Sequence, residues 1–284
     1  MKNIFIVLLL VCSGTAVSQQ ADSIHVKTDS LYIASIEKQK GRAKIMHAEP
    51  LYIDLIRDLG ARKGEREWNF GTGIVDNNTY DVYQALIEYE WAPLNRLGVE
   101  VELPFTFTPS SSWQKQVNKL NSLKLATQYT ALVHEPSKTS VAVGYLHEFE
   151  LPAFHSYGKT ALLAGHTLSP FFIAAKRFGS NWHGLLYTGP IWQYHASSKH
   201  WHRSGQYNLS SHYMLPGTRN FIGVEVNASS TKQDLDVTIR PQMRLSISDN
   251  LLIGIVAGIP VKRENQRLSS FARIIYEPGH KHRQ

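Results

Sequence analysis

Hydrophobic and polar residues alternate along most of the chain from Trp68 onward. Every second residue from Val99 to Phe107 is apolar, and the same period of two runs from Leu235 to Ile247. Successive side chains of an extended chain point to opposite faces, so this period gives a strand with one apolar and one polar face. The pattern therefore predicts β-strands and excludes helices in these stretches.

About twelve such strands follow one another. They lie near residues 68–75, 80–91, 98–108, 119–134, 139–150, 160–175, 183–195, 206–215, 220–231, 235–248, 251–262 and 268–276. Most of these runs reach the roughly 9 to 11 residues with which a tilted strand crosses the apolar layer of a membrane. We therefore expect an all-β fold, a closed antiparallel transmembrane β-barrel of about twelve strands.

The connections between these strands alternate between short and long. The short ones are turn-like and cover residues 92–97, 135–138, 177–182, 216–219 and 249–250, whereas mostly longer polar links cover 109–118, 151–159, 196–205 and 263–267. Outer-membrane barrels have tight turns on the periplasmic side and longer loops outside. The alternation indicates such a barrel, in the outer membrane of a Gram-negative bacterium.

The polar face of the predicted strands carries many charges. Those expected in the lumen are Glu88, Glu90, Glu100, Glu102, Glu148, Arg240, Arg244, Lys262 and Arg273. A closed sheet of about twelve strands is too wide for one layer of aliphatic side chains to fill, so we expect the apolar face to meet lipid and these charges to face a wet interior. The acidic and basic groups flank the closing seam. They indicate either a field that orients a solute in a pore or a salt-bridge network that plugs the barrel.

Four large aromatic residues are expected at the periplasmic rim. Trp68 begins the first strand, Trp91 ends the second, Trp182 lies in a short turn and Tyr276 ends the last strand. Tryptophan and tyrosine favour the boundary between hydrocarbon and water. Their common position supports the predicted topology.

The N-terminal part of the chain differs from the strand region. Residues 1–18 have the pattern of a signal peptide, with Lys2 before an apolar run and a cleavage site at Ala16 to Ser18, and Cys12 leaves lipidation as an alternative. Residues 19–67 form the expected periplasmic leader, in which apolar residues at helical spacing between Pro50 and Gly60 predict a short amphipathic helix. The barrel is expected over residues 68–276, and residues 277–284 form a basic tail.

Composition narrows the possible functions. The 284 residues are 43% hydrophobic and contain one cysteine, which lies in the predicted signal peptide, so no disulfide or thiolate site is expected after cleavage. The net charge of +7 suggests nucleic-acid binding as a function, but the sequence contains no nucleic-acid recognition element that would support it. The expected partners are outer-membrane lipids, lipopolysaccharide, the barrel-assembly machinery and small solutes. Lipopolysaccharide phosphates are expected at the loop cations Lys115, Lys199, Arg203, Arg263 and Arg267.

Three stretches carry a resemblance to a known group. They are HAEPLYIDLIRDLGARKGEREWNFGTG at residues 47–73, the segment from Trp91 to Gly98, and Val99 to Phe105. The chain resembles uncharacterised outer-membrane barrels of Bacteroidetes-type bacteria, a group similar to the meta-pathway phenol-degradation porins. The resemblance implies an outer-membrane barrel that passes small organic solutes, and it implies no catalytic residues.

One pair of residues permits an enzymatic alternative. His195 and Ser197 form an H-x-S pair that resembles outer-membrane phospholipases and lipid A deacylases, in which a histidine base activates a serine nucleophile. Those families continue with Asn and a small residue, whereas Ser198 and Lys199 follow here. This departure leaves the residue that would orient the imidazole unassigned.

A metal site is the second alternative for the same segment. His200 and His202 share a face of an extended chain, and His195 or His212 could approach them as a third imidazole ligand for Zn or Cu. Solvated loop histidines explain the pattern better, because two histidines at this spacing in a loop are a weak signal for a metal. We therefore expect a passive channel or uptake porin without cofactor or catalysis, with a lipid hydrolase and a plugged structural barrel as the alternatives.

Overall fold

The fold was obtained as a computed structural model, which describes residues 33, 36–38, 41–53, 55–110, 116–232, 234–264 and 266–279. The predicted signal peptide, Lys115 and residues 280–284 of the predicted tail lie outside these residues. Among the described residues, no helix has the length and apolar character that crossing a membrane requires.

Within the described residues, thirteen strand segments make up one antiparallel sheet. They are β1 (Arg66–Asn77), β2 (Asp81–Leu94), β3 (Leu97–Thr108), β4 (Val117–Leu120), β5 (Ser122–His134), β6 (Thr139–Glu150), β7 (Gly165–Phe178), β8 (Trp182–His195), β9 (His200–Met214), β10 (Phe221–Ser230), β11 (Leu235–Ser248), β12 (Leu251–Pro260) and β13 (Gln266–Tyr276). A single 3₁₀ turn, η2 (Phe154–Ser156), is described outside them.

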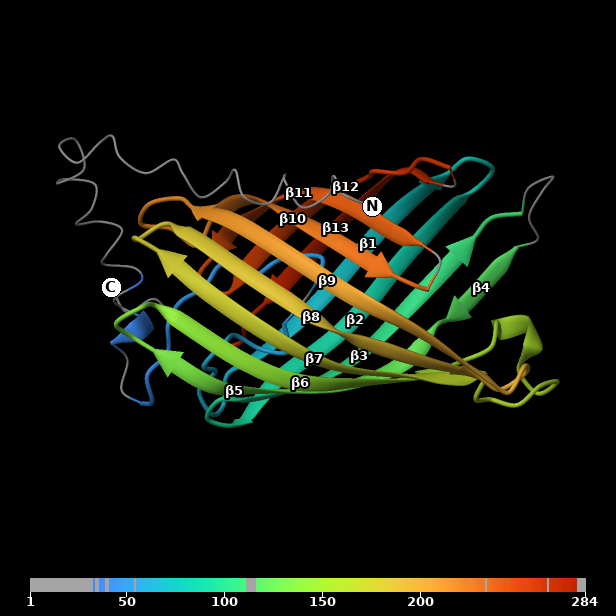
Figure 1. Cartoon of the computed structure of the whole chain (residues 1–284), viewed down its shortest axis with the longest axis horizontal. Helices are drawn as coiled ribbons and strands as arrows, with labels where there is room; N and C mark the ends of the chain where they lie inside the picture. The colour runs from blue at the N-terminus through green and yellow to red at the C-terminus, as the bar shows by residue number, and fades with distance from the viewer. Residues whose placement is uncertain are drawn as a thin grey trace.

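The sheet closes on itself between the first and last strands. Trp68 of β1 pairs with Tyr276 of β13 on one side and with Tyr89 of β2 on the other. Segments β4 and β5 both pair with β3 and are separated by Asn121, so they form one interrupted strand. Twelve strands therefore surround the lumen (Figure 1), and the predicted closed antiparallel barrel is confirmed.

The strand boundaries differ from the predicted ones mainly at β7 and β9. Strand β7 begins at Gly165 rather than near residue 160, and β9 begins at His200 rather than near residue 206. The connection predicted as a long link from 196 to 205 is thus a four-residue turn between His195 and His200. Backbone pairing continues through polar residues because the hydrogen-bonded ladder does not require an apolar face.

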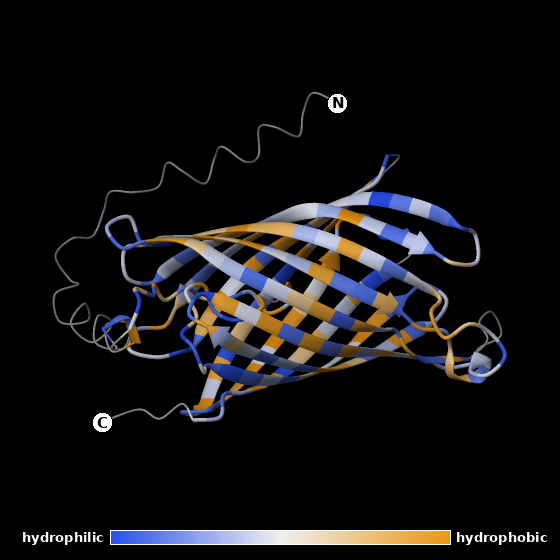
Figure 2. Cartoon of the chain, turned by 90° about the horizontal axis from the view of Figure 1, so that it is seen from below, coloured by the Kyte–Doolittle hydropathy of each residue, from blue (hydrophilic) through white to orange (hydrophobic). Residues whose placement is uncertain are grey.

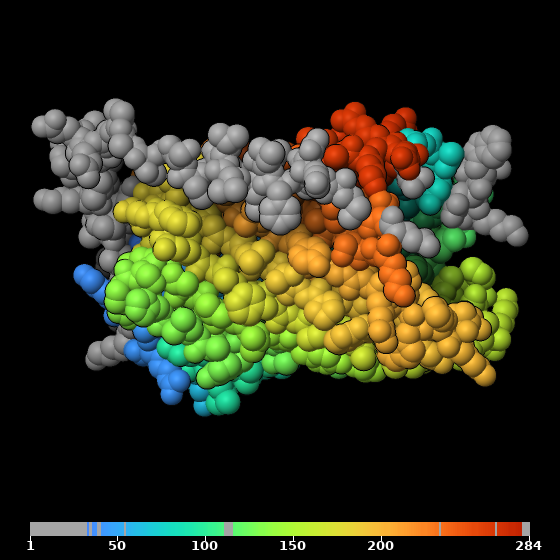
Figure 3. Space-filling view, viewed as in Figure 1, coloured from blue at the N-terminus to red at the C-terminus, as the bar shows by residue number. Residues whose placement is uncertain are grey.

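The apolar face of the strands points outward. On β11, Ile239, Met243 and Leu245 are exposed, whereas the intervening Arg240 and Arg244 are buried. Figure 2 shows this alternation as neighbouring orange and blue bands along the strands, and side chains of β6 to β9 form a continuous outer wall in Figure 3. This arrangement is the reverse of a small soluble barrel, in which apolar side chains fill the interior.

The described part of the leader, residues 44–53 and 55–60, runs inside the barrel. It enters at the end that carries the short turns and both ends of the barrel sheet (Figure 1). The predicted amphipathic helix between Pro50 and Gly60 is wrong, because the described residues of this segment form bends and turns. Arg57 has φ of 70° and Gly60 has φ of 83°, and such left-handed residues cannot continue a right-handed helix.

Candidate functional site

Leader backbone groups are hydrogen-bonded to side chains on one wall of the lumen. The amide of Leu51 donates to Gln242 Oε1 at 2.7 Å, and the amide of Ile53 donates to Glu225 Oε1 at 3.1 Å. The Arg240 guanidinium lies 3.5 Å from the centre of the Tyr52 ring. Polar residues of β10 and β11 thus replace the hydrogen bonds that a helix would have formed within itself.

The opposite wall holds the leader in the same manner. His47 Nε2 lies 2.9 Å from Ser140 Oγ, and the Ala48 amide donates to His183 Nδ1 at 3.0 Å. The Gly60 amide donates to Thr130 Oγ1 at 2.9 Å. These partners are strand side chains, whereas further along the leader backbone pairs join it to β2, with the Gly64 amide donating to the Ala92 carbonyl oxygen and the Ala92 amide donating to that of Glu65.

Apolar leader residues are buried in two patches of the lumen. Leu51 packs with residues of β9 to β13, including Leu252 and Ile275. Leu55, Ile56 and Leu59 pack on the other side of the lumen, against residues of β5 to β8. Burying an aliphatic side chain of this size contributes about 1.5–3 kcal/mol, so these four residues supply much of the attachment.

Arg57 joins the leader to an acidic wall. Its Nη1 atom lies 2.6 Å from Glu67 Oε2 and 3.6 Å from Glu90 Oε2, and its backbone amide donates to Glu90 Oε2 at 2.8 Å. Its carbonyl oxygen accepts a hydrogen bond from Gln128 Nε2 at 2.8 Å. Because the guanidinium is buried, removing it would leave carboxylates without their counter-charge.

A second group of charges fastens the leader near the short-turn end. Lys44 Nζ lies 2.5 Å from Asp58 Oδ2 and 2.8 Å from Glu65 Oε2. Burial alone would raise the pKa of Asp58, but the Lys44 ammonium and the Arg57 guanidinium outweigh it and hold that pKa well below its usual range. The Asp58 carboxylate is therefore charged at neutral pH.

The leader separates two water-accessible cavities. One of about 610 Å³ lies on the long-loop side, and its lining includes Tyr52, Ile56, Glu100 and Glu148. The other, of about 480 Å³, lies on the short-turn side, and its lining includes Lys44 and Arg57. The candidate functional site is therefore a polar lumen in which the leader lies between two cavities.

The structure places most of the predicted lumen charges on the inner face. Buried side chains there include Glu88, Glu90, Glu100, Glu102, Arg240, Arg244 and Arg273, and Glu148 is half-buried in the lining of the larger cavity. The prediction for Lys262 is wrong. Strand β12 ends at Pro260, so Lys262 lies in the following loop, where it is exposed and forms an ion pair with Asp234.

The four predicted rim aromatics lie towards the end of the barrel that carries the short turns. Trp68, Trp182 and Tyr276 are exposed, and Trp91 is half-buried. Tyr89 lies between Trp68 and Trp91, with ring centres 4.6 Å and 5.4 Å away. Their position at a membrane interface remains a prediction.

His195 and Ser197 lie at the opposite end of the barrel, in and beside the turn between β8 and β9. The His195 Nδ1 atom is 3.9 Å from Glu150 Oε2. No hydrogen bond joins the His195 and Ser197 side chains within the part of the chain that is described, and Ser197 is exposed. The geometry thus supplies a carboxylate near the imidazole but no contact between base and nucleophile.

The structure brings only some of the histidines named as metal ligands together: His195 pairs with His200 in the strand register, whereas His212 lies apart. His200 and His202 are exposed at the start of β9, whereas His212 is buried near its other end, about 30–40 Å away at 3.3 Å per residue. Within the described residues, no third His, Cys, Asp or Glu completes a compact group with His200 and His202. His212 therefore cannot be their partner.

Sequence reasoning did not identify the residues that hold the leader. Glu225 and Gln242 follow the ordinary alternation of their strands, and His183 has no motif around it. The only signal was the resemblance carried by residues 47–73, whose first residues lie against all three of these side chains.

Comparisons with known proteins agree with this architecture. Three solved structures have similar folds. An outer membrane channel from Pseudomonas putida F1 has a TM-score of 0.61 and 11% identity, and the match covers 78% of this chain and 98% of that one. NanC porin (TM-score 0.54, 10% identity) and KdgM porin (TM-score 0.52, 11% identity) each match over 74% of this chain and 98% of their own. At these identities the likeness establishes the fold alone. No curated protein matches the sequence.

The sequence itself matches one family. Residues 43–277 match the HAEPLYID-like family, and the letters of its name are those of residues 47–54 in this chain. The match spans the occluding leader and all the strands of the barrel. The chain therefore belongs to the HAEPLYID-like family.

Proposed function

We propose that this protein is an outer-membrane channel for small solutes and that its leader is the gate. The observation that carries the proposal is the leader between the cavities of about 610 Å³ and 480 Å³. Its residues between Lys44 and Gly60 are held by side-chain hydrogen bonds, ion pairs and apolar contacts, and backbone hydrogen bonds to β2 and its turn follow from Ala61. Such contacts can be exchanged while the barrel stays closed, so the leader can shift without breaking the wall.

The charges around the larger cavity favour small cationic or neutral organic solutes. Its lining includes Glu100, Glu102, Glu148 and Glu150, against which stand Lys124 and Arg273. An excess of carboxylates in a confined lumen attracts cations and repels anions. Phe271 adds an apolar surface to the same lining. The resemblance to phenol-degradation porins supports a small organic solute.

The orientation in the membrane follows from the loops. We place the short turns and the leader entry in the periplasm and the longer connections outside the cell, as in outer-membrane barrels. The basic side chains Lys199, Arg203, Arg263 and Arg267 then face the phosphates of lipopolysaccharide. We retain a Gram-negative, Bacteroidetes-type source and insertion by the barrel-assembly machinery as parts of this proposal.

Planar-bilayer recording tests the proposal. The purified full-length protein, checked as a folded barrel by its altered gel mobility before boiling, is expected to give discrete currents that carry K⁺ in preference to Cl⁻. Liposome swelling then ranks small amines, neutral phenols and carboxylic acids, with acids the slowest. A folded protein that passes neither ions nor solutes at any salt or voltage, with the gate intact or weakened, would instead be a plugged structural barrel.

A further inference from the structure

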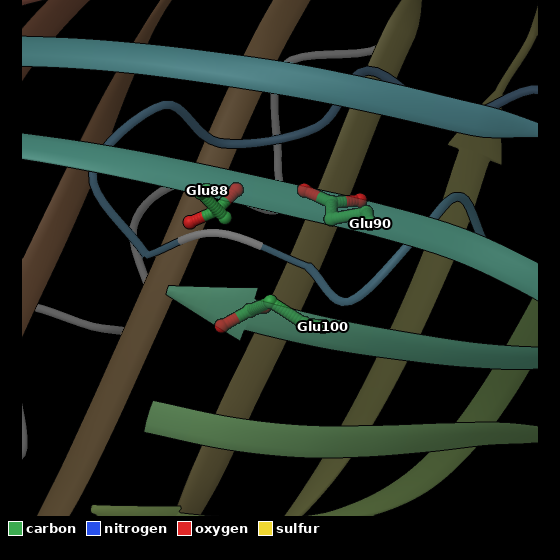
Figure 4. A group of neighbouring side chains, drawn as sticks. All are labelled: Glu88, Glu90 and Glu100. Carbon is green, nitrogen blue, oxygen red and sulfur yellow. The ribbon is translucent and has the colours of Figure 1, made fainter. Parts of the chain in front are cut away.

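Three buried carboxylates converge on the lumen wall beside the leader. Glu88 and Glu90 lie on β2, and Glu100 lies on β3 directly opposite Glu90 in the strand register. They are 1%, 2% and 4% exposed, and one oxygen from each lies within 4.8 Å of the others. Figure 4 shows these side chains on neighbouring strands next to the leader backbone. This spacing suits an ion that sits about 2.3–2.6 Å from each oxygen.

The charges of this wall are not balanced by the described side chains. Five carboxylates face three basic groups: Glu67, Glu88, Glu90, Glu100 and Glu102 against Arg57, Lys124 and Arg273. Glu148 pairs with Lys124 in the strand register and adds a further acidic group. Like charges directly opposite on neighbouring strands are destabilising, and burial strengthens their repulsion. Two positive charges, from a metal ion or from bound protons, would balance the five carboxylates against the three basic groups.

Asn69 provides an independent observation. It is fully buried on β1, and its Nδ2 atom lies 3.0 Å from Glu67 Oε1, 2.7 Å from Glu88 Oε1 and 3.0 Å from Glu90 Oε1. An amide nitrogen has two hydrogens and cannot satisfy three acceptors. Its Oδ1 atom has no hydrogen-bond partner in the described structure. A rotation of the amide about its last bond would exchange the two atoms and present an oxygen to the carboxylates.

We propose that Glu88, Glu90 and Glu100, together with Asn69 Oδ1, bind one divalent cation of the Ca²⁺ class. Carboxylate and amide oxygens are the ligands that hard cations prefer, and two positive charges match the excess of carboxylates. Glu90, one of the ligands, also accepts the amide of Arg57, so the bound ion stabilises the wall on which the leader is fastened. Ion binding does not require solute transport, since a plugged barrel would bind the ion equally well, but Glu100 belongs both to this site and to the lining of the larger cavity.

Equilibrium dialysis with ⁴⁵Ca²⁺ tests this site. The full-length protein is stripped with EDTA in detergent and then refolded with Ca²⁺ up to about 1 mM, the weak end of the range for protein calcium sites. We expect one bound Ca²⁺ per chain, affinity for Ca²⁺ about tenfold weaker or worse in Glu100→Gln, and tighter binding in Asn69→Asp, which adds a fourth carboxylate. Glu225→Gln is the matched control, because Glu225 is a fully buried carboxylate that binds the leader from β10.

Two results would contradict the proposed cation site. One is a folded parent protein that binds no Ca²⁺, Mg²⁺ or Mn²⁺ under these conditions. The other is an equal loss of binding in Glu100→Gln and Glu225→Gln, which would assign the effect to general destabilisation. If Glu100→Gln does not fold, the parent stoichiometry and the Asn69→Asp affinity decide the question, and unchanged affinity in Asn69→Asp counts against the site.

Discussion

Gly98 of β3 and Ile56 of the leader are in direct backbone contact. A Cβ atom on Gly98 would lie 1.9 Å from the Ile56 carbonyl oxygen, far inside any possible contact distance. Only glycine therefore lets the leader lie this close to the wall, and the contact is made next to Arg57, the residue that joins the leader to the acidic wall.

Gly98→Ala is expected to weaken the docking of the leader. Moving the leader backbone away from the added methyl group costs about 1–3 kcal/mol, as in other overpacked sites, which corresponds to roughly 5- to 160-fold more of the released state. Single-channel open probability measures this change. Gly184→Ala is the control, because its added Cβ would meet the Phe178 side chain at 3.4 Å and the Ser210 carbonyl oxygen at 3.9 Å, with no closer neighbour. Equal behaviour of the two variants would show that the leader does not occlude the path.

Arg57→Met is expected to release the leader from the acidic wall. Removing one partner of a buried ion pair costs about 3–5 kcal/mol. The Arg57 pair exists only when the leader is docked, so the substitution destabilises the docked state and not the released one. Limited proteolysis of the leader in detergent should become much faster than in the parent. Arg267→Ala is the control, since its pair with Asp76 is exposed and worth about 0–1 kcal/mol. An unchanged rate of proteolysis in Arg57→Met would show that Arg57 does not hold the leader on the wall.

Acidification is expected to release the leader through His47. Burial is the main cause that lowers the pKa of His47 to about 3, and the nearby Arg177 guanidinium adds to the effect. The released imidazole has its ordinary pKa of about 6.5, so the released state binds the extra proton and docking loses stability as the pH falls from about 6.5 towards 3. Between about pH 7.5 and pH 5 the released fraction should rise roughly 30-fold, or about 2 kcal/mol.

The variant His47→Asn identifies the group responsible. It retains a side-chain hydrogen-bond donor near Ser140 but does not titrate in this range. Open probability measured at both pH values should therefore change much less in His47→Asn than in the parent. The same pH dependence in both proteins would assign the response to another group.

Charge on the outer face of the barrel is expected to be far more costly than charge in the lumen. Met243 is exposed on β11, and arginine at the middle of a bilayer costs about 2–4 kcal/mol on the lipid side of a barrel. Met243→Arg should therefore lower the urea midpoint of the protein folded into vesicles. Gln193→Arg is the lumen control, because Gln193 contacts Glu150 inside the larger cavity. A greater loss in Gln193→Arg would contradict the assignment of the two faces.

The barrel could be predicted from the sequence because its signal is local. In β11, each apolar residue such as Ile239 or Met243 is followed by a polar one, and this period alone defines the strand and its two faces. The same alternation identified Arg240 and Arg244 as lumen groups. It failed at Lys262, where the polar and apolar pattern continues past Pro260 although the strand has ended.

The leader could not be predicted in the same way because its conformation depends on distant partners. Leu51, Leu55, Ile56 and Leu59 have helical spacing, but they pack on two different sides of the lumen. The backbone between them is satisfied by Gln242 and Glu225, which are more than 170 residues away in the chain. Tertiary contacts thus override a local helical pattern.

A reversible lock between the leader and the wall tests the gate most directly. A Cβ atom on Gly254 of β12 would lie 3.3 Å from Leu51 Cγ, so the double variant Leu51→Cys and Gly254→Cys places two cysteines within reach of a disulfide. Planar-bilayer conductance is recorded for the oxidised protein and again after reduction. We expect the oxidised protein to stay closed and the reduced protein to conduct. Equal conductance in the two forms would contradict a leader that gates the lumen.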